Sequence, residues 1–153
     1  MLVADPASPD FNAYCDLAEA EAYIDTLAFN EAWAGKTDKQ KEGALINAAT
    51  WMDGLDWKGK PINARQPLAW PRAEAIVNGE ELPHDEIPKR VKEANAEFAM
   101  RLLAEDRAAD AEKGVALGSL RTSDTERKLI PDSVKDLVKP YIKAATSVRI
   151  ARA

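Results

Sequence analysis

The heptapeptide "QPLAWPR", residues 66–72, constrains the fold of this chain more than any other stretch. It sets Trp70 between two prolines, in a sequence otherwise rich in alanine, leucine and charged residues. Because proline lacks a backbone N–H and fixes its φ angle, the stretch cannot be a regular helix. It is either a loop that displays an aromatic ring to a ligand or a connection whose aromatic ring fills a core. We favour the core, since a buried tryptophan stabilises a fold by roughly 3–5 kcal/mol relative to alanine.

Two helices are predicted before this stretch. The first begins where Asp16 and Glu19 have the spacing of a capping box, and it either continues past residue 28 or is followed by a second short turn. The second helix begins at the capping box of Thr37 and Gln40 and ends near residue 55. Its apolar stripe has helical spacing and consists of Ala44, Leu45, Ala48, Trp51, Met52 and Leu55.

Between residues 56 and 83 the helical periodicity disappears, because prolines and glycines recur there. A connection of this length is unusual in a compact domain unless its own side chains pack. We predict that its side chains pack on the preceding helix and form a structural core of Trp51, Trp57, Leu68 and Trp70. The sequence does not assign a partner to the Arg72 side chain, which could pair with an acid at a subunit boundary.

The remainder of the chain predicts one long helix, a short β element and a last helix. The long helix begins between residues 85 and 88 and extends to about Lys113. Residues 115–130 fit two short strands or an extended loop, and because an isolated hairpin is marginal in water this segment should pair with something else. Asp132 or Ser133 would cap the last helix, which Pro140 interrupts.

The pattern as a whole predicts a mainly α fold. It has three main helices, the connection rich in tryptophan and proline, a short β-hairpin or extended loop, and a C-terminal helix followed by a tail. At 153 residues the chain fits one domain with a real hydrophobic core. We place this domain at residues 1–140, with an extended N-terminal arm at 1–13 and a C-terminal tail at 141–153.

Residues suited to catalysis or metal binding are scarce. Cys15 and His84 are the only cysteine and histidine, and a buried thiol and a solvated or capping imidazole explain them better than a nucleophile–base pair. Motifs for zinc, calcium or phosphate binding are absent from the sequence. We therefore expect a protein that is not an enzyme and that has no cofactor and no metal; a hydrolase using Cys15 or His84 is the weakest of our hypotheses.

Charge is distributed unevenly along the chain. Residues 1–35 contain seven acids and no lysine or arginine, whereas residues 137–153 contain four basic residues and no acid. Such ends could be solvated faces, or the basic end could dock on an acidic surface of another copy or of a partner. The pI of about 5.0 and the neutral or acidic surroundings of the tryptophans argue against a nucleic-acid binder. No apolar run is long enough to cross a membrane, and with one cysteine we expect folding in the cytoplasm.

The sequence resembles the head–tail adaptor proteins of tailed bacteriophages, also called head completion or connector proteins, which include a group labelled "DnaT-like single-stranded-DNA-binding". Similar segments follow one another in order across nearly the whole chain. The segments are "AYCDLAEAEAYI" (13–24), "WAGKTDKQKEGALINAATWMDGLDWKGKP" (33–61), "QPLAWPR" (66–72), "LPHDEIPKRVKEANAEFA" (82–99), "KGVALGSLR" (113–121) and "IPDSVKDLVKPYI" (130–142). The resemblance implies a small helical adaptor in the virion neck, made in the host bacterial cytoplasm.

The resemblance also implies partners. Copies would form a homo-oligomeric ring, commonly of twelve, beneath the portal protein, with the tail or the next neck protein below and DNA passing through the channel without specific binding. By position, the portal-docking residues would be Tyr141, Ile142, Lys143, Arg149, Ile150 and Arg152. The subunit interface would include Val115, Leu117, Leu120 and Arg121. The alternative is a DnaT-like module that binds single-stranded DNA as a replication accessory.

Overall fold

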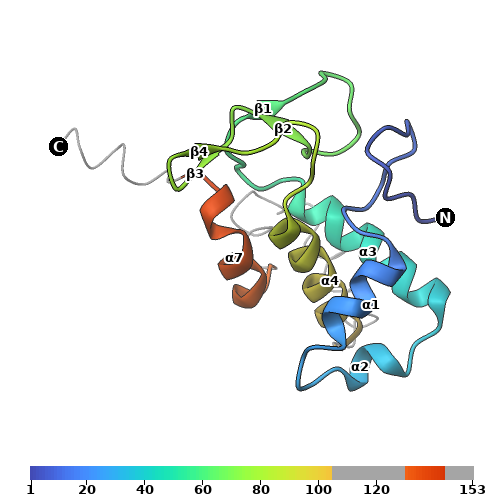
Figure 1. Ribbon diagram of the computed structural model, residues 1–153. Helices are drawn as coiled ribbons and strands as arrows, with labels where there is room; N and C mark the ends of the chain where they lie inside the picture. The colour runs from blue at the N-terminus through green and yellow to red at the C-terminus, as the bar shows by residue number, and fades with distance from the viewer. Residues whose placement is uncertain (105–129, 144–153) are drawn as a thin grey trace, which may run out of the picture.

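The computed structural model describes residues 1–104 and 130–143 (Figure 1). These residues form a mainly helical body with two short antiparallel strand pairs at one end. The elements are α1 (Leu17–Ile24), α2 (Glu31–Ala34), α3 (Asp38–Met52), β1 (Lys60–Pro61), β2 (Arg72–Ala73), β3 (Ile76–Val77), β4 (Glu80–Glu81), α4 (Lys89–Ala104), α7 (Asp132–Val138) and the 3-10 turn η2 (Lys139–Tyr141). In the part of the chain that the structure describes, no helix is long and apolar enough to span a bilayer.

Both predicted capping boxes are confirmed. The Asp16 carboxylate accepts from the Glu19 amide at 2.8 Å, and the Glu19 side chain accepts from the Asp16 amide, so α1 begins where predicted. Thr37 and Gln40 make the same reciprocal pair at the start of α3. Between them, α1 ends at Ile24 and the separate short helix α2 follows. Of the two predicted alternatives, a longer first helix or a second short turn, the second is therefore the one observed.

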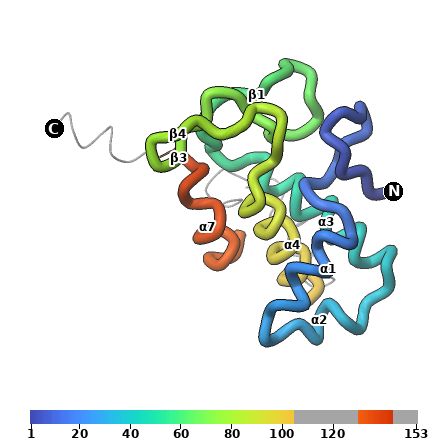
Figure 2. The backbone as a smooth tube through the Cα atoms, viewed as in Figure 1, coloured from blue at the N-terminus to red at the C-terminus, as the bar shows by residue number. Residues whose placement is uncertain are grey.

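Helix α4 lies at the centre of the body, with α1, α3 and α7 packed against it (Figures 1 and 2). Its inward face buries Val91, Ala94 and Phe98 completely. The polar Asn95 lies on the same face and is also fully buried. Burial of this apolar face contributes to the driving force for folding.

The N-terminal arm ends inside the core. The side-chain oxygen of Asn12 accepts from the Val3 amide at 2.8 Å, while the Val3 carbonyl accepts from the Asn12 amide at 2.9 Å. These two bonds fold residues 3–12 into a closed loop, so that Phe11 and Tyr14 enter the core. The rings of Phe11 and Tyr14 meet edge to face at 6.1 Å between centroids.

The connection between α3 and α4 contains two strand pairs, where the sequence excluded a regular helix and indicated no strands. Strand β1 pairs with β2, and β3 pairs with β4 through a turn at Asn78 and Gly79, both with positive φ. An Asn-Gly turn of this kind matches the twist of a two-residue hairpin. The strands have only two residues each, which is too short for a period-two pattern to appear in the sequence.

Gly59 is required where the chain enters β1. Its φ is +75°, and a Cβ placed there would overlap the carbonyl oxygen of Ala73 and lie 2.9 Å from the amide nitrogen of Ala75. We expect Gly59→Ala to lower the free energy of unfolding by about 2 kcal/mol, from backbone strain and overlap together. Chemical denaturation would measure this change in the free energy of unfolding.

Two other glycines are the matched controls. Gly79→Ala keeps the positive φ but meets no atom within 4 Å, so strain alone should cost about 1 kcal/mol. Gly43 lies in α3 with open space around it, so Gly43→Ala should raise the free energy of unfolding by about 0.5–1 kcal/mol. Equal losses for Gly59→Ala and Gly79→Ala would contradict the steric part of the prediction.

The last helix starts differently from the prediction. Pro131 occupies the N-cap position of α7 and makes no side-chain cap, while Asp132 and Ser133 lie in the first turn. The Ser133 hydroxyl donates instead to the Glu97 carboxylate of α4 at 3.3 Å. The prediction that Asp132 or Ser133 caps this helix was therefore wrong. The predicted interruption at Pro140 is confirmed by the change from α7 to η2.

Candidate functional site

The connection that follows α3, residues 56–77, here called the strap, is closed by one amide side chain. The Nε2 atom of Gln66 donates to the carbonyl oxygens of Leu68, Ala69 and Pro71 at 2.8, 3.0 and 2.9 Å. The peptide bond between Trp70 and Pro71 is cis. The Gln66 side chain therefore fixes the backbone path of "QPLAWPR", in which Trp70 is fully buried.

Arg72, in β2, bonds to the backbone just before β1 and so links two parts of the strap. Its Nε donates to the Lys58 carbonyl at 2.7 Å, and its Nη2 donates to the Gly59 carbonyl at 2.9 Å. Only 9% of the residue is exposed. The guanidinium thus binds backbone within its own chain.

Three of the four predicted core side chains are buried. Trp70 is fully buried, and Trp57 and Leu68 are nearly so. The rings of Trp57 and Trp70 meet edge to face at 5.6 Å, a favourable aromatic geometry. The Trp57 indole also donates to the Met52 carbonyl at 3.1 Å, and so satisfies an end group of α3.

Trp51, the fourth predicted core residue, is not buried. It is 38% exposed, and its ring contacts Phe98 of α4 at 5.8 Å rather than Trp57 or Trp70. It follows Ala48 and Ala49, which are fully buried, and precedes Met52, which is also buried. Trp51 therefore lies at the edge of the α3 stripe, where one side of its ring reaches the surface.

Segment 141–143 joins the strap at the same place, and we call this junction the C-terminal joint. The Lys58 amide donates to the Tyr141 carbonyl at 2.8 Å, and the Lys143 amide donates to the Asp56 carbonyl at 2.9 Å. These bonds form an antiparallel bridge between Trp57 and Ile142. The Tyr141 ring packs edge to face on Trp70 at 6.1 Å, so the chain is held to the core up to Lys143.

The structure divides the predicted docking residues into two groups. Tyr141 and Ile142 are half-buried in the C-terminal joint and Lys143 is exposed. The other predicted residues lie outside the described residues; they are Arg149, Ile150 and Arg152 of the tail and Val115, Leu117, Leu120 and Arg121 of the predicted interface. The described contacts therefore extend three residues beyond the predicted domain boundary at 140.

Asp53 anchors the strap to α3 and to the N-terminal arm. Its carboxylate accepts from the Ala69 amide and, at 3.1 Å, from the Tyr14 hydroxyl. Burial raises the pKa of Tyr14 well above its ordinary value, and the nearby Asp53 charge raises it further. Sequence reasoning missed this residue, because a carboxylate just after a helix end has no periodicity that marks it as a ligand of distant backbone.

Cys15 and His84 do not form a reactive pair. Cys15 is buried, with its thiol 3.8 Å from the Asn95 side-chain oxygen, whereas His84 is exposed in the loop before α4. Within residues 1–104 and 130–143, no group of three or more His, Cys, Asp or Glu side chains could hold a metal ion. The described geometry offers no site for nucleophilic chemistry at Cys15.

The Cys15 thiol should be unreactive in the folded protein. Burial raises its pKa from 9.0 to about 12, and the carboxylates of Glu19 and Asp16 add to the rise. Thiolate is the reactive form, so we expect alkylation at mildly alkaline pH to be at least about 100-fold slower in native than in denatured protein. Native and denatured rates with iodoacetamide would measure this, and equal rates would contradict the burial.

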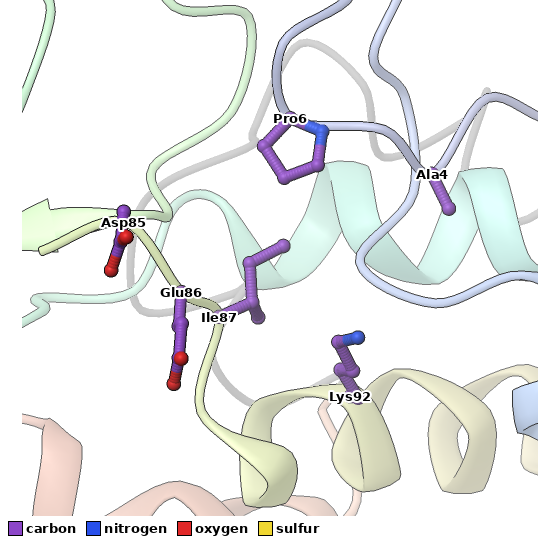
Figure 3. Close-up of a pocket in the computed structure, with 6 residues that line it drawn as sticks. All are labelled: Ala4, Pro6, Asp85, Glu86, Ile87 and Lys92. Atoms are coloured by element: carbon purple, nitrogen blue, oxygen red, sulfur yellow. The ribbon is translucent and has the colours of Figure 1, made fainter. Parts of the chain in front are cut away.

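A shallow hollow of about 340 Å³ lies between the N-terminal arm and the start of α4 (Figure 3). Ala4 and Pro6 form one side and Ile87 the other, with the Lys92 side chain pointing between them (Figure 3). The Lys92 ammonium already pairs with Glu19 at 2.7 Å. Its charge is therefore compensated within the body, and the hollow offers no free group to bind an anion.

Comparison with known proteins identifies one family. A family model described as "Putative DnaT-like ssDNA binding protein" matches residues 1–153. No curated protein matches the chain, and no solved structure does.

Proposed function

We propose, starting from the premise that the chain belongs to the "Putative DnaT-like ssDNA binding protein" family, that it serves as a structural head–tail adaptor of a tailed bacteriophage. In this proposal copies form a ring, of twelve if it follows the common pattern, beneath the portal. The ring joins the capsid to the tail or the next neck protein and continues the DNA channel. The protein is then a virion component with no catalytic role.

The C-terminal joint is the observation that carries this proposal. Residues 141–143 lie directly beside the strap that holds Trp70, the largest fully buried side chain of the described residues. The ten residues that follow contain two arginines and no acid. A basic segment that starts from a firmly held point suits docking on an acidic partner surface, because its attachment to the body is fixed before it binds.

The tryptophans support the same proposal. Binding of single strands generally uses exposed aromatic rings beside basic residues. Trp33, Trp57 and Trp70 are at most 3% exposed, so their rings stabilise the body and are not available to stack on bases. The strap and the packing of α2 account for these three tryptophans, whereas Trp51 is 38% exposed and packs on Phe98.

A truncation tests the adaptor. We expect deletion of residues 144–153 to weaken binding to the portal protein of the same phage by at least about tenfold in a pull-down titration, while the melting temperature stays unchanged. The double variant Lys36→Ala and Lys39→Ala, which removes two cations at the other end of the body, is the control and should bind normally. If the truncated protein binds the portal as tightly as the intact chain, the docking role of the tail is wrong.

The predicted ring contact can be tested separately. We propose that residues 115–130, including Val115, Leu117 and Leu120, contact the neighbouring subunit. Hydrogen exchange in that segment should slow when rings form, because amides that pair across an interface are shielded from water. Equal exchange in monomer and ring would remove this segment from the interface.

The family description favours one second candidate, a single-stranded-DNA-binding module. Lys139 and Lys143 flank Tyr141 at the C-terminal joint, where exposed cations lie beside a half-buried aromatic ring. A gel-shift titration at low and moderate salt decides between the two functions: an adaptor should show at most weak, salt-labile retention. Tight retention that is lost in Lys139→Glu and Lys143→Glu would favour the DNA-binding module.

A further inference from the structure

We infer that Asn78 is a modification site, at which the chain deamidates spontaneously and forms aspartate and isoaspartate. Asn78 and Gly79 form the turn between β3 and β4, and both residues are exposed. Asparagine followed by glycine is the dipeptide in which this reaction meets the least steric hindrance, because glycine has no side chain. Nothing in this chemistry depends on the proposed function.

Asn78 is the only asparagine in the chain that is followed by glycine. The other five asparagines are followed by alanine or glutamate; they are Asn12, Asn30, Asn47, Asn63 and Asn95. These five are an internal reference, because they share the side chain of Asn78 and differ in the residue that supplies the attacking nitrogen. The sequence therefore singles out position 78.

The reaction consumes water and releases ammonia. The Gly79 nitrogen attacks Cγ of Asn78, so that a new C–N bond closes a succinimide ring, and the side-chain –NH2 leaves as ammonia with the proton that the Gly79 nitrogen loses. Water then opens the ring. Cleavage of the bond to Cγ gives aspartate, whereas cleavage of the bond to the backbone carbonyl carbon gives isoaspartate, in which the main chain passes through Cγ.

Both reacting groups are free in the structure. Within residues 1–104 and 130–143, neither the Gly79 amide nor the Asn78 side chain has a hydrogen-bond partner. A Cβ built on Gly79 would meet no atom within 4 Å, so no neighbouring segment crowds that side of the turn. The attacking nitrogen therefore has no hydrogen bond to break and no obstruction to pass.

The hairpin that contains this turn is small enough to open. Strands β3 and β4 have two residues each, and only Val77 among them is half-buried. One further bond, from the Leu82 amide to the Ala75 carbonyl at 2.8 Å, extends the pairing. A hairpin of this size is marginal in water, so it opens locally without unfolding of the core. Ring closure requires the peptide after Asn78 to rotate out of the turn, and the open states permit that rotation.

The two products change the hairpin differently. Aspartate places a new carboxylate beside the exposed carboxylates of Glu80 and Glu81, and like charges there repel. Isoaspartate adds one atom to the main chain within the turn. Because the length of the turn sets the register of a hairpin, the observed pairing of Val77 with Glu80 is lost in that product. Strand β3 also lies against η2, so the isoaspartyl form loosens the chain beside the C-terminal joint.

Amide exchange measures this structural consequence. Anion-exchange chromatography separates protein that has gained a negative charge, and methylation by an isoaspartyl methyltransferase reports its isoaspartate content. In the isoaspartyl form the Leu82 amide should exchange at least about tenfold faster than in the unmodified protein. The variant Asn78→Asp, which adds the charge without the extra backbone atom, is the control and should exchange as the unmodified protein does. Unchanged exchange in the isoaspartyl form would contradict the loss of pairing.

Peptide mapping of the intact, folded protein tests the site itself. Trypsin places Asn78 in peptide 73–89 and Asn63 in peptide 59–65, because it does not cut before proline. Asn63 is the matched control, since it is also exposed in a loop but is followed by alanine. During several weeks at physiological temperature and pH, peptide 73–89 should gain about one dalton at least about tenfold faster than peptide 59–65 does.

A variant separates the effect of glycine from the effect of hairpin opening. Gly79→Ala strains the turn and so favours opening, yet its methyl group hinders the attacking nitrogen. We therefore expect conversion of Asn78 to become at least about tenfold slower. Faster conversion in Gly79→Ala, or equal rates at Asn78 and Asn63 in the unmodified sequence, would overturn the inference. Conversion of Asn78 in the urea-denatured chain but not in the folded protein would overturn it as well, because the fold would then protect the site.

Discussion

Replacing Trp70 with alanine is expected to lower the free energy of unfolding by about 4 kcal/mol, the largest loss that we predict for a single substitution. The side chain is fully buried and contacts both Trp57 and Tyr141. Its removal leaves a cavity that the strap cannot easily fill, because Gln66 and Arg72 hold the surrounding backbone. Urea denaturation followed by circular dichroism would measure the loss.

Two further substitutions make this prediction specific. Phe29→Ala removes an aromatic ring that is 81% exposed and should change stability by less than about 0.5 kcal/mol. Trp70→Phe should cost less than Trp57→Phe, because the Trp70 indole N–H has no partner among the described residues whereas Trp57 donates to Met52. A stable Trp70→Ala variant that lost a partner would show that the side chain is a binding residue.

Asn95→Ala is expected to cost about 3 kcal/mol. The Asn95 side chain accepts from the Tyr14 amide at 2.9 Å and donates to the Leu45 carbonyl at 3.0 Å, and it is completely buried. Alanine would leave the buried Tyr14 amide without an acceptor and would leave a cavity as well. Thermal and chemical denaturation should therefore both show a large loss.

The control is another asparagine within a helix. Asn47 lies in α3 and is exposed, so Asn47→Ala should be neutral or slightly stabilising because alanine has the higher helix propensity. Asn95→Asp tests the hydrogen bonds apart from the volume: it keeps the acceptor for Tyr14 but loses the donor to Leu45 and buries a charge. A loss from Asn95→Ala no greater than that from Asn47→Ala would mean that water replaces both bonds.

Local signals in the sequence predicted the starts of α1 and α3 correctly. A capping box is completed within four residues, so the sequence contains everything that forms it. The burial of Trp57, Leu68 and Trp70 also followed from composition, because a proline-rich connection needs packed side chains to keep one path.

Contacts between distant residues could not be predicted in the same way. Asn95 and Asp53 act on backbone groups far away in the sequence, whose position depends on the finished fold, and an isolated asparagine or aspartate in a sequence does not reveal such a role. The start of α7 was wrong for a related reason. Ser133 has a partner on α4 that competes with a capping position, and the sequence gives no sign of that partner.

The position of α7 and the C-terminal joint has a consequence for synthesis of the protein. Residues 130–142, including Val134, Val138 and Tyr141, complete a core whose other described members lie within residues 1–104. On the ribosome, the emerging chain can form its capped helices early, but Trp70 and the α4 surface stay uncovered until α7 and Tyr141 have emerged. A nascent chain that stalls before α7 has emerged therefore exposes apolar surface that invites chaperones and proteases.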